Sequence, residues 1–191
     1  MIIGGDGKSH TYQPDEWNSL GQEMSRLAKE HGIKWLVSTS RRTGGDNEAL
    51  LKEALDPACV CEAIWWATEP KKGLAAYIHA GEKVFVTRDS LTMISEVVAV
   101  KGRAEVVYPS NFRLGPESAY ERYLGRLAKE RRLGAHPINR IELNGILPPL
   151  TSVNEEQQIF IRSLLARIDR VLGKIVPPRS PSLEIPGKKA H

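Results

Sequence analysis

Hydrophobic and polar positions along the chain follow two patterns, short apolar runs and longer stretches with helical spacing. The short apolar runs predict strands, and they lie at residues 1–3, 33–37, 59–66, 83–87 and 104–108. Apolar residues that recur every three to four positions predict helices, and these lie at residues 14–31, 46–55, 74–79, 91–100, 116–132 and 154–172. Asp46 or Asn47 can cap the second of these helices. Strands and helices therefore alternate along most of the chain.

This alternation predicts an α/β fold with a doubly wound, mostly parallel sheet and helices on both of its faces. We assign residues 1–173 to this domain, including the helix at 154–172. The segment 174–191 is rich in proline and basic residues, which predicts a disordered tail. In such sheets ligands bind where strands end and helices begin. This rule selects three segments, at residues 4–10, 38–43 and 88–96.

Charge and composition narrow the class of protein. The net charge of +4 is concentrated in the tail, so it does not indicate a nucleic-acid partner. No apolar run reaches the roughly 18 residues that a membrane span needs, so we expect no transmembrane segment. Cys59 and Cys61 are expected to be reduced thiols in or near the core of a cytoplasmic protein. A peripheral position at the inner membrane face is left open.

The first selected segment is the glycine-rich turn after the opening apolar run. Gly4 and Gly5 would let the backbone approach a phosphate, and Lys8 could add a positive charge. Neither standard phosphate motif fits, because Ile2 stands where a P-loop needs its first glycine and His10 stands where the dinucleotide fingerprint needs its last. The alternative is an ordinary glycine turn.

The second and third segments combine arginines with a helix start. Ser40, Arg41 and Arg42 follow an apolar strand, and arginine forks suit phosphate oxygens, although a solvated charged loop has the same composition. Ser90 can cap a helix whose first amides would face a diphosphate. Glu96 in the second turn could accept both hydroxyls of a ribose. The alternative is that Ser90 is only a cap and Glu96 only a surface charge.

The remaining polar and aromatic residues give weaker signals. Histidines 31, 79 and 136 are expected at helix ends or on the surface. Of the adjacent tryptophans at 65 and 66, one is expected to pack inward and the other to face a helix or solvent. Histidine, cysteine and carboxylate residues show no metal-ligand spacing, so we predict neither a metal nor a cofactor.

The three selected segments together resemble the mitochondrial fission ELM-like family, a bacterial and plant group with glycosyltransferase-like sequences. The resemblance covers about residues 1–145. Its features are Ile-Gly-Gly-Asp-Gly-Lys-Ser-His at the start, Thr-Ser-Arg-Arg-Thr at 39–43 and Thr-Arg-Asp-Ser-Leu-Thr-Met-Ile-Ser-Glu at 87–96. The most specific part is the set Asp89, Ser90, Met93, Ser95 and Glu96.

The segment from Ser90 to Glu96 is also similar to the donor-binding segment of GT-B glycosyltransferases. This resemblance implies the carboxyl-terminal, Rossmann-like half of a GT-B fold, which holds a nucleotide-diphosphate sugar. It assigns Ser90 to the phosphates and Glu96 to the ribose, with Gly4, Gly5 and the Arg41–Arg42 pair around the same ligand. We also expect Lys8, Ser40, Asp89 and Met93 to contact this ligand. It also implies an amino-terminal domain, absent from this sequence, which would carry the acceptor site. Glycosyl transfer is then expected only when both halves are joined.

Two other functions are compatible with the sequence. One is a nucleotide-sugar hydrolase or epimerase on the same fold, for which His10 is the candidate acid or base. The other is a non-catalytic interaction domain, whose long helices at 116–132 and 154–172 would form a docking surface. A stub-like first strand and an absent partner domain would leave apolar surface exposed, so self-association is a further expectation.

Overall fold

The computed structural model describes residues 1–7, 11–109 and 118–143, which lie in one compact unit, Met1–Leu150. The helix expected at 154–172 and the tail expected at 174–191 lie outside the described residues, as do Lys8 and His10.

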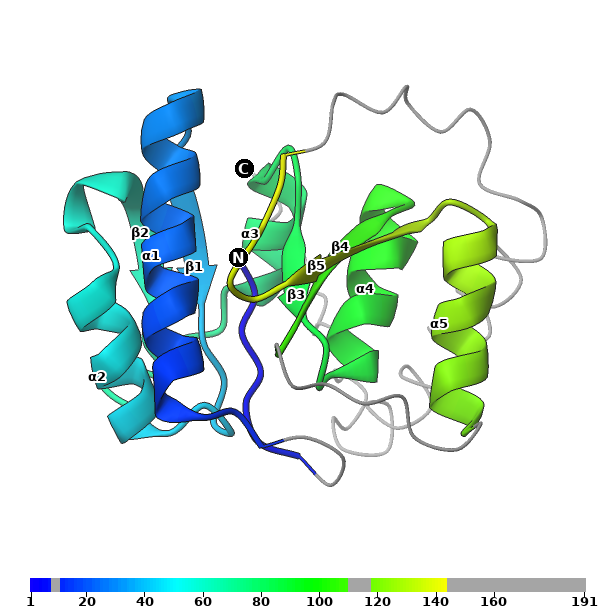
Figure 1. Cartoon of the computed structure of the whole chain (residues 1–191), viewed down its shortest axis with the longest axis horizontal. Helices are drawn as coiled ribbons and strands as arrows, with labels where there is room; N and C mark the ends of the chain where they lie inside the picture. Colours follow the sequence, from blue (N-terminus) through cyan, green and yellow to red (C-terminus); the bar gives the residue numbers. More distant parts are fainter. Residues whose placement is uncertain (8–10, 110–117, 144–191) are drawn as a thin grey trace, which may run out of the picture. The chain divides into compact units, whose positions relative to one another are not determined.

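Strands and helices alternate through the described part of the chain (Figure 1). In order they are α1 (Pro14–His31), β1 (Trp35–Ser38), α2 (Gly45–Ala54), the 3-10 turn η1 (Pro57–Cys59), β2 (Val60–Ile64), α3 (Leu74–Ala80), β3 (Phe85–Thr87), α4 (Leu91–Lys101), β4 (Ala104–Tyr108), α5 (Ala119–Lys129) and β5 (Leu133–Pro137). The elements expected in residues 14–108 are confirmed, with small shifts in their ends.

All strand pairs are parallel. β1 pairs with β2, and β3, β4 and β5 form a second sheet in that order. Ile2 forms parallel bridges to both Ser38 and Val86 and thereby joins the two sheets. The strand order is thus β2–β1–Ile2–β3–β4–β5. The chain winds outward to β2, then returns to the other side of Ile2, so the doubly wound α/β fold is confirmed.

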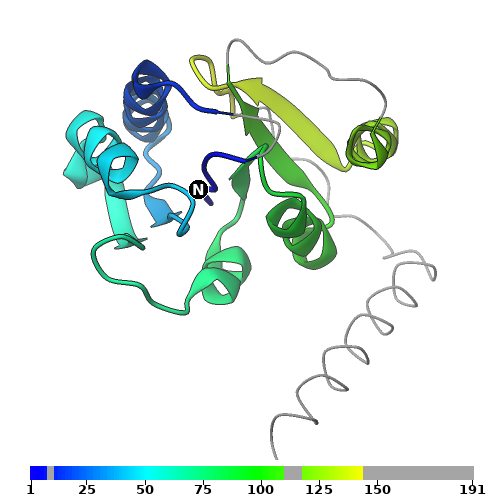
Figure 2. The ribbon, with the colours of Figure 1, turned by 90° about the horizontal axis from the view of Figure 1, so that it is seen from below.

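Helices cover both faces of this sheet (Figure 2). Because side chains alternate between faces along a strand, neighbouring residues of one strand enter different cores. Phe85 belongs to the cluster that contains α1 and α2, whereas Val84 and Val86 belong to the cluster with α3, α4 and α5. In the same way Ile3 enters the first cluster and Ile2 the second.

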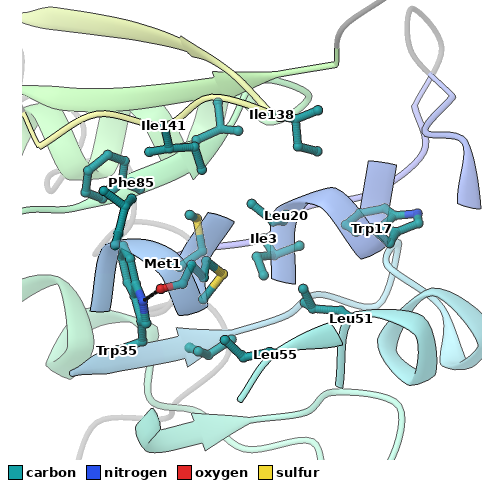
Figure 3. Close-up of a cluster of buried hydrophobic side chains, with 14 of the residues drawn as sticks. Met1, Ile3, Trp17, Leu20, Trp35, Leu51, Leu55, Phe85, Ile138 and Ile141 are labelled. Carbon is teal, nitrogen blue, oxygen red and sulfur yellow. Dashed lines mark hydrogen bonds between the residues drawn. The ribbon is translucent and has the colours of Figure 1, made fainter. Parts of the chain in front are cut away.

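The first cluster is centred on α1 (Figure 3). Trp17, Leu20 and Met24 of this helix are all fully buried. The indole Nε1 of Trp35 donates to the carbonyl oxygen of Met24 over 2.7 Å, which satisfies the indole as it enters the core. Gly32 caps the C-terminus of α1, and its φ of 64° is a left-handed conformation that glycine adopts without strain.

Three local expectations need correction. The edge strand β5 was not predicted, and His136, expected at a helix end or on the surface, lies buried in it. The N-cap of α2 is Gly44 rather than Asp46 or Asn47.

The expectation for the tryptophan pair agrees with the structure, and that for the cysteine pair agrees for Cys59 but not for the exposed Cys61. Trp65 packs against the first cluster while Trp66 is 36% exposed. Cys59 and Cys61 are both free, the first buried and the second exposed.

Among the described residues, no helix is both long and apolar enough to cross a membrane.

Candidate functional site

The candidate site lies at the carboxyl edge of the sheet, where the segments after Ile3, β1 and β3 meet. These three segments follow adjacent parallel strands at the point where the winding of the chain reverses. Such a switch point is the usual ligand position in open α/β sheets. The three segments selected from the sequence therefore come together in the structure.

The glycine turn packs tightly against its neighbours. The Gly4 N–H donates to Thr87 Oγ1 over 2.7 Å, and the Gly5 N–H donates to Asp89 Oδ2 over 3.0 Å. A Cβ atom on Gly4 would lie 1.9 Å from Asp89 Oδ2, and one on Gly5 would lie 2.2 Å from the Arg42 carbonyl oxygen. Both amides are thus occupied within the chain, in contrast to the open amides expected for a phosphate loop. The glycines are needed for close packing of the three segments.

Hydroxyl groups of the loop after β1 hold this turn from the other side. Ser40 Oγ donates to the carbonyl oxygen of Gly4 over 2.9 Å and accepts from the Arg42 N–H over 3.2 Å. The buried Thr43 hydroxyl also donates to the Gly4 carbonyl oxygen. Ser40, which we expected near a ligand, therefore joins the loop to the glycine turn.

Arg42 and Asp89 form an ion pair across the site. Arg42 Nη2 lies 2.6 Å from Asp89 Oδ2, and Arg42 Nη1 lies 3.4 Å from the carbonyl oxygen of Asp6. The Asp89 side chain is 1% exposed, whereas that of Arg42 is 39% exposed. Arg41 is also exposed, and it makes no hydrogen bond or ion pair with the residues that the structure describes.

The N-terminus of α4 completes the site. Ser90 caps the helix as predicted, because its Oγ accepts from the Met93 N–H. Leu91 and Thr92 in the first turn are exposed. Helix geometry leaves their N–H groups without partners inside the helix, so this end attracts anions. Met93, expected to contact a ligand, is half-buried against the core of the α4 face.

Glu96 lies on the second turn of α4 and is exposed. Neighbouring protein atoms nevertheless shield its carboxyl group from part of the solvent, and this desolvation raises the pKa of the group above the ordinary value. Within the described part of the chain Glu96 makes no hydrogen bond or ion pair, so its oxygens are open to a ligand hydroxyl.

Two residues at this edge were missed by the sequence interpretation. Tyr12, just before α1, is buried, and its hydroxyl donates to Asp89 Oδ1 over 3.2 Å. Burial and the neighbouring Asp89 charge both raise its pKa. Thr87 ends β3 and receives the Gly4 N–H. Tyr12 belongs to no motif, and only its position just before a helix could have indicated it. Thr87 opens the 87–96 motif, but the sequence interpretation assigned it no role of its own.

A groove of ≈ 690 Å³ lies next to this site, between α5 and the strands β4 and β5. Val106, Leu133 and Ala135 form part of its lining. The lining also includes the buried Arg88, which donates from Nη2 to both carboxylate oxygens of Glu121 at 2.6 Å each. Arg88 is committed to this pair, so the groove does not extend the Arg42 cluster.

Among the described residues, no group of histidine, cysteine and carboxylate side chains could hold a metal ion.

Comparisons with known proteins and protein families bear on the family of the chain. A structural search matched the crystal structure of a dodecameric FMN-dependent Ubix-like decarboxylase from Escherichia coli O157:H7, with 11% identity and a TM-score of 0.39, covering 96% of this chain and 98% of that one. No curated protein matched the chain. The family model described as Mitochondrial fission ELM1 matches residues 1–140, a span that includes the three segments of the candidate site. The chain therefore belongs to the Mitochondrial fission ELM1 family.

Proposed function

We propose that the carboxyl edge of this sheet binds the diphosphate of a nucleotide sugar, and that the chain is the donor-binding half of a GT-B glycosyltransferase-like protein. The proposal rests on one observation: the exposed, Ser90-capped N-terminus of α4 lies at the same sheet edge as the Arg41–Arg42 loop. A helix N-terminus and arginine side chains both favour an anion, and here they converge at the switch point.

Each group has a distinct task in this proposal. The N–H groups of Leu91 and Thr92 and the helix dipole bind one phosphate, and the exposed arginines bind the other. Glu96, one turn further along the helix, accepts the ribose hydroxyls. The glycine turn keeps the loops close together, since its own amides are already bonded.

The chemistry that follows is electrostatic. When the glycosyl bond breaks, negative charge develops on the departing diphosphate, and preorganised donors at that position lower the barrier. The acceptor and the group that removes its proton would come from the amino-terminal domain of the GT-B pair. This division of labour is part of the proposal, as is the nucleotide-sugar partner.

Isothermal calorimetry with UDP, GDP, CMP and ADP tests the proposal. We expect one nucleoside diphosphate to bind, and Glu96→Ala to weaken that binding by about 1.5–3 kcal/mol, the scale of a charged hydrogen bond. Glu82→Ala is the matched control, because Glu82 is an exposed carboxylate before β3, at the opposite end of that strand.

Two results would contradict the proposal. A non-catalytic docking domain would bind no nucleotide at millimolar concentration and would tolerate Glu96→Ala. A hydrolase or epimerase would bind nucleotide sugar and turn it over without a second domain, and His10→Ala would abolish that turnover.

A further inference from the structure

Asp89 has an unusual set of partners for a residue at an anion site. Its buried carboxylate accepts three hydrogen bonds, from the Gly5 N–H, the Tyr12 hydroxyl and the Arg42 guanidinium. The donors come from three separate segments: the glycine turn, the start of α1 and the loop after β1. Asp89 is therefore the point at which the three segments are tied together.

These contacts exclude Asp89 from direct contact with a ligand. Its side chain is 1% exposed, and both oxygens are occupied. A carboxylate would also repel a phosphate. The sequence interpretation placed Asp89 among the ligand-binding residues, and the geometry instead places it behind them.

Arg42 is held by this carboxylate while part of its surface remains open. Removing Arg42 would leave the buried Asp89 charge without its cationic partner, which is unfavourable. An incoming anion therefore cannot easily draw Arg42 away from the 1%-exposed Asp89. Arg42 stays tethered and can bind a ligand only through the 39% of its side chain that faces solvent.

Building on the proposed diphosphate site, we propose that Asp89 is a positioning residue that acts through Arg42. It fixes the direction of the guanidinium over the glycine turn, so that Arg42 offers N–H groups to the diphosphate in one orientation. Arg41, which has no such tether within the described residues, supplies charge without a fixed direction.

A double-mutant cycle with inorganic pyrophosphate as the probe tests this role. Asp89→Asn removes a negative charge near the anion in any background, which alone tightens binding. When Arg42 is present, Asp89→Asn also frees its guanidinium, which weakens pyrophosphate binding. The net gain in affinity should therefore be about tenfold smaller than in an Arg42→Gln background, or it should become a loss. Equal effects of Asp89→Asn in the two backgrounds would overturn the proposal, because Asp89 would then act only as a charge.

A second pair of variants leaves the buried carboxylate intact, in case Asp89→Asn fails to fold. Lysine keeps the positive charge but loses the planar fork of arginine. Arg42→Lys should weaken pyrophosphate binding about fivefold to tenfold, whereas Arg41→Lys should change it less than twofold. Equal losses for the two variants would contradict a special orientation of Arg42.

The tether can also be measured without any ligand. The Nε–Hε signal of Arg42 in a nitrogen–proton correlation spectrum, assigned by its loss in Arg42→Gln, should be sharp in wild type and broadened or averaged in Asp89→Asn. An unchanged signal would overturn the proposal. If wild type binds neither pyrophosphate nor nucleotides, the proposed function fails, and this signal alone decides whether Asp89 positions Arg42.

Discussion

Two buried carboxylates in this fold each pair with an arginine and pack against a glycine, but the two arginines differ in how far they face solvent. Asp89, after β3, pairs with Arg42, and Glu105, in β4, pairs with Arg103 over 2.8 Å and with His136 over 2.9 Å. Each carboxylate packs against a glycine, Gly4 in one case and Gly134 in the other. The arginines differ in exposure, 39% for Arg42 and 22% for Arg103.

The position of each pair in the sheet explains this difference. Glu105 lies inside a strand, and its partner Arg103 is further bound to the carbonyl oxygen of Arg131 over 2.9 Å, so the cluster is closed. Asp89 lies beyond the end of β3, where loops meet, so its arginine faces solvent. The same chemical pair therefore stabilises the fold in the strand and presents a cation at the sheet edge.

The largest expected effect comes from filling the space that the glycines leave. In Gly4→Ala the new Cβ meets the short Asp89 side chain at 1.9 Å, and the loops must separate. We expect a loss of about 3 kcal/mol in unfolding free energy, which combines overpacking with damage to a buried pair. Urea denaturation monitored by tryptophan fluorescence measures it.

Gly134→Ala is the comparison variant, because its Cβ would lie 1.6 Å from Glu105 Oε2. The Glu105 side chain has one more rotatable bond than that of Asp89, so its carboxylate can shift further. We expect a smaller loss, about 1–2 kcal/mol. A larger loss for Gly134→Ala than for Gly4→Ala would show that the strand cluster is the more rigid of the two.

The second effect separates stability from binding. Arg103→Gln removes a partner from a closed cluster and should cost about 2–3 kcal/mol of unfolding free energy. Arg42→Gln should cost about 1 kcal/mol, because the arginine is partly exposed and glutamine can still donate to Asp89. Pyrophosphate affinity should show the reverse order, with a loss for Arg42→Gln and no change for Arg103→Gln. The same order in both measurements would remove the functional distinction between the clusters.

A third, smaller effect concerns acid stability. Burial raises the pKa of Glu105, but the hydrogen bonds and charges of His136 and Arg103 outweigh it and hold the pKa below the usual range. Since the folded pKa is depressed, the ionised carboxylate stabilises the fold above the ordinary glutamate pKa, and this contribution disappears as the pH falls through the folded value.

Denaturation curves between pH 7 and about pH 3 check the sign of this effect. Wild type should lose more unfolding free energy over this range than Glu105→Gln, which has no carboxylate to protonate. Glu142→Gln, at an exposed carboxylate paired with Arg140, is the control and should follow wild type. Parallel curves for wild type and Glu105→Gln would contradict the depressed pKa.

Local patterns predicted most of the elements but not the edge strand. α1 and β4 were predicted because their apolar spacing is a property of a few neighbouring residues. β5 reads Leu-Gly-Ala-His-Pro, in which glycine and proline argue against a strand. It forms because β4 offers a parallel partner and because Gly134 leaves room for the Glu105 carboxylate.

The sequence predicted which three segments form the site, but not the contacts between their side chains. Parallel strands bring their carboxyl ends to one edge, so the three segments could be selected from the strand pattern alone. The partners of Asp89 lie 84, 77 and 47 positions away in the chain, at Gly5, Tyr12 and Arg42. Contacts over such separations depend on how the loops pack, and no residue pattern encodes them. For this reason Asp89 was assigned to the ligand and Tyr12 was overlooked.

The smallest expected effect is spectroscopic, and it examines Asp89 through Oδ1, which binds Tyr12, whereas Arg42 binds Oδ2. Burial raises the pKa of Tyr12 well above its ordinary value, and the charge of Asp89 and the hydrogen bond to it raise it further. Asp89→Asn removes the charge, so Tyr12 should ionise at a lower pH in this variant while remaining buried. Alkaline titration by absorbance at the tyrosinate band, with Tyr12→Phe to identify the signal, measures the shift.

The control for this titration is Glu105→Gln. Glu105→Asn is not used because it would also shorten the side chain. It removes an equivalent buried charge from the strand cluster and should leave the Tyr12 titration unchanged. If both variants lowered the pKa of Tyr12 alike, the shift would reflect a general loosening of the fold. If only Asp89→Asn lowered it, the Asp89 carboxylate would act directly on Tyr12, as its role in holding the three segments together requires.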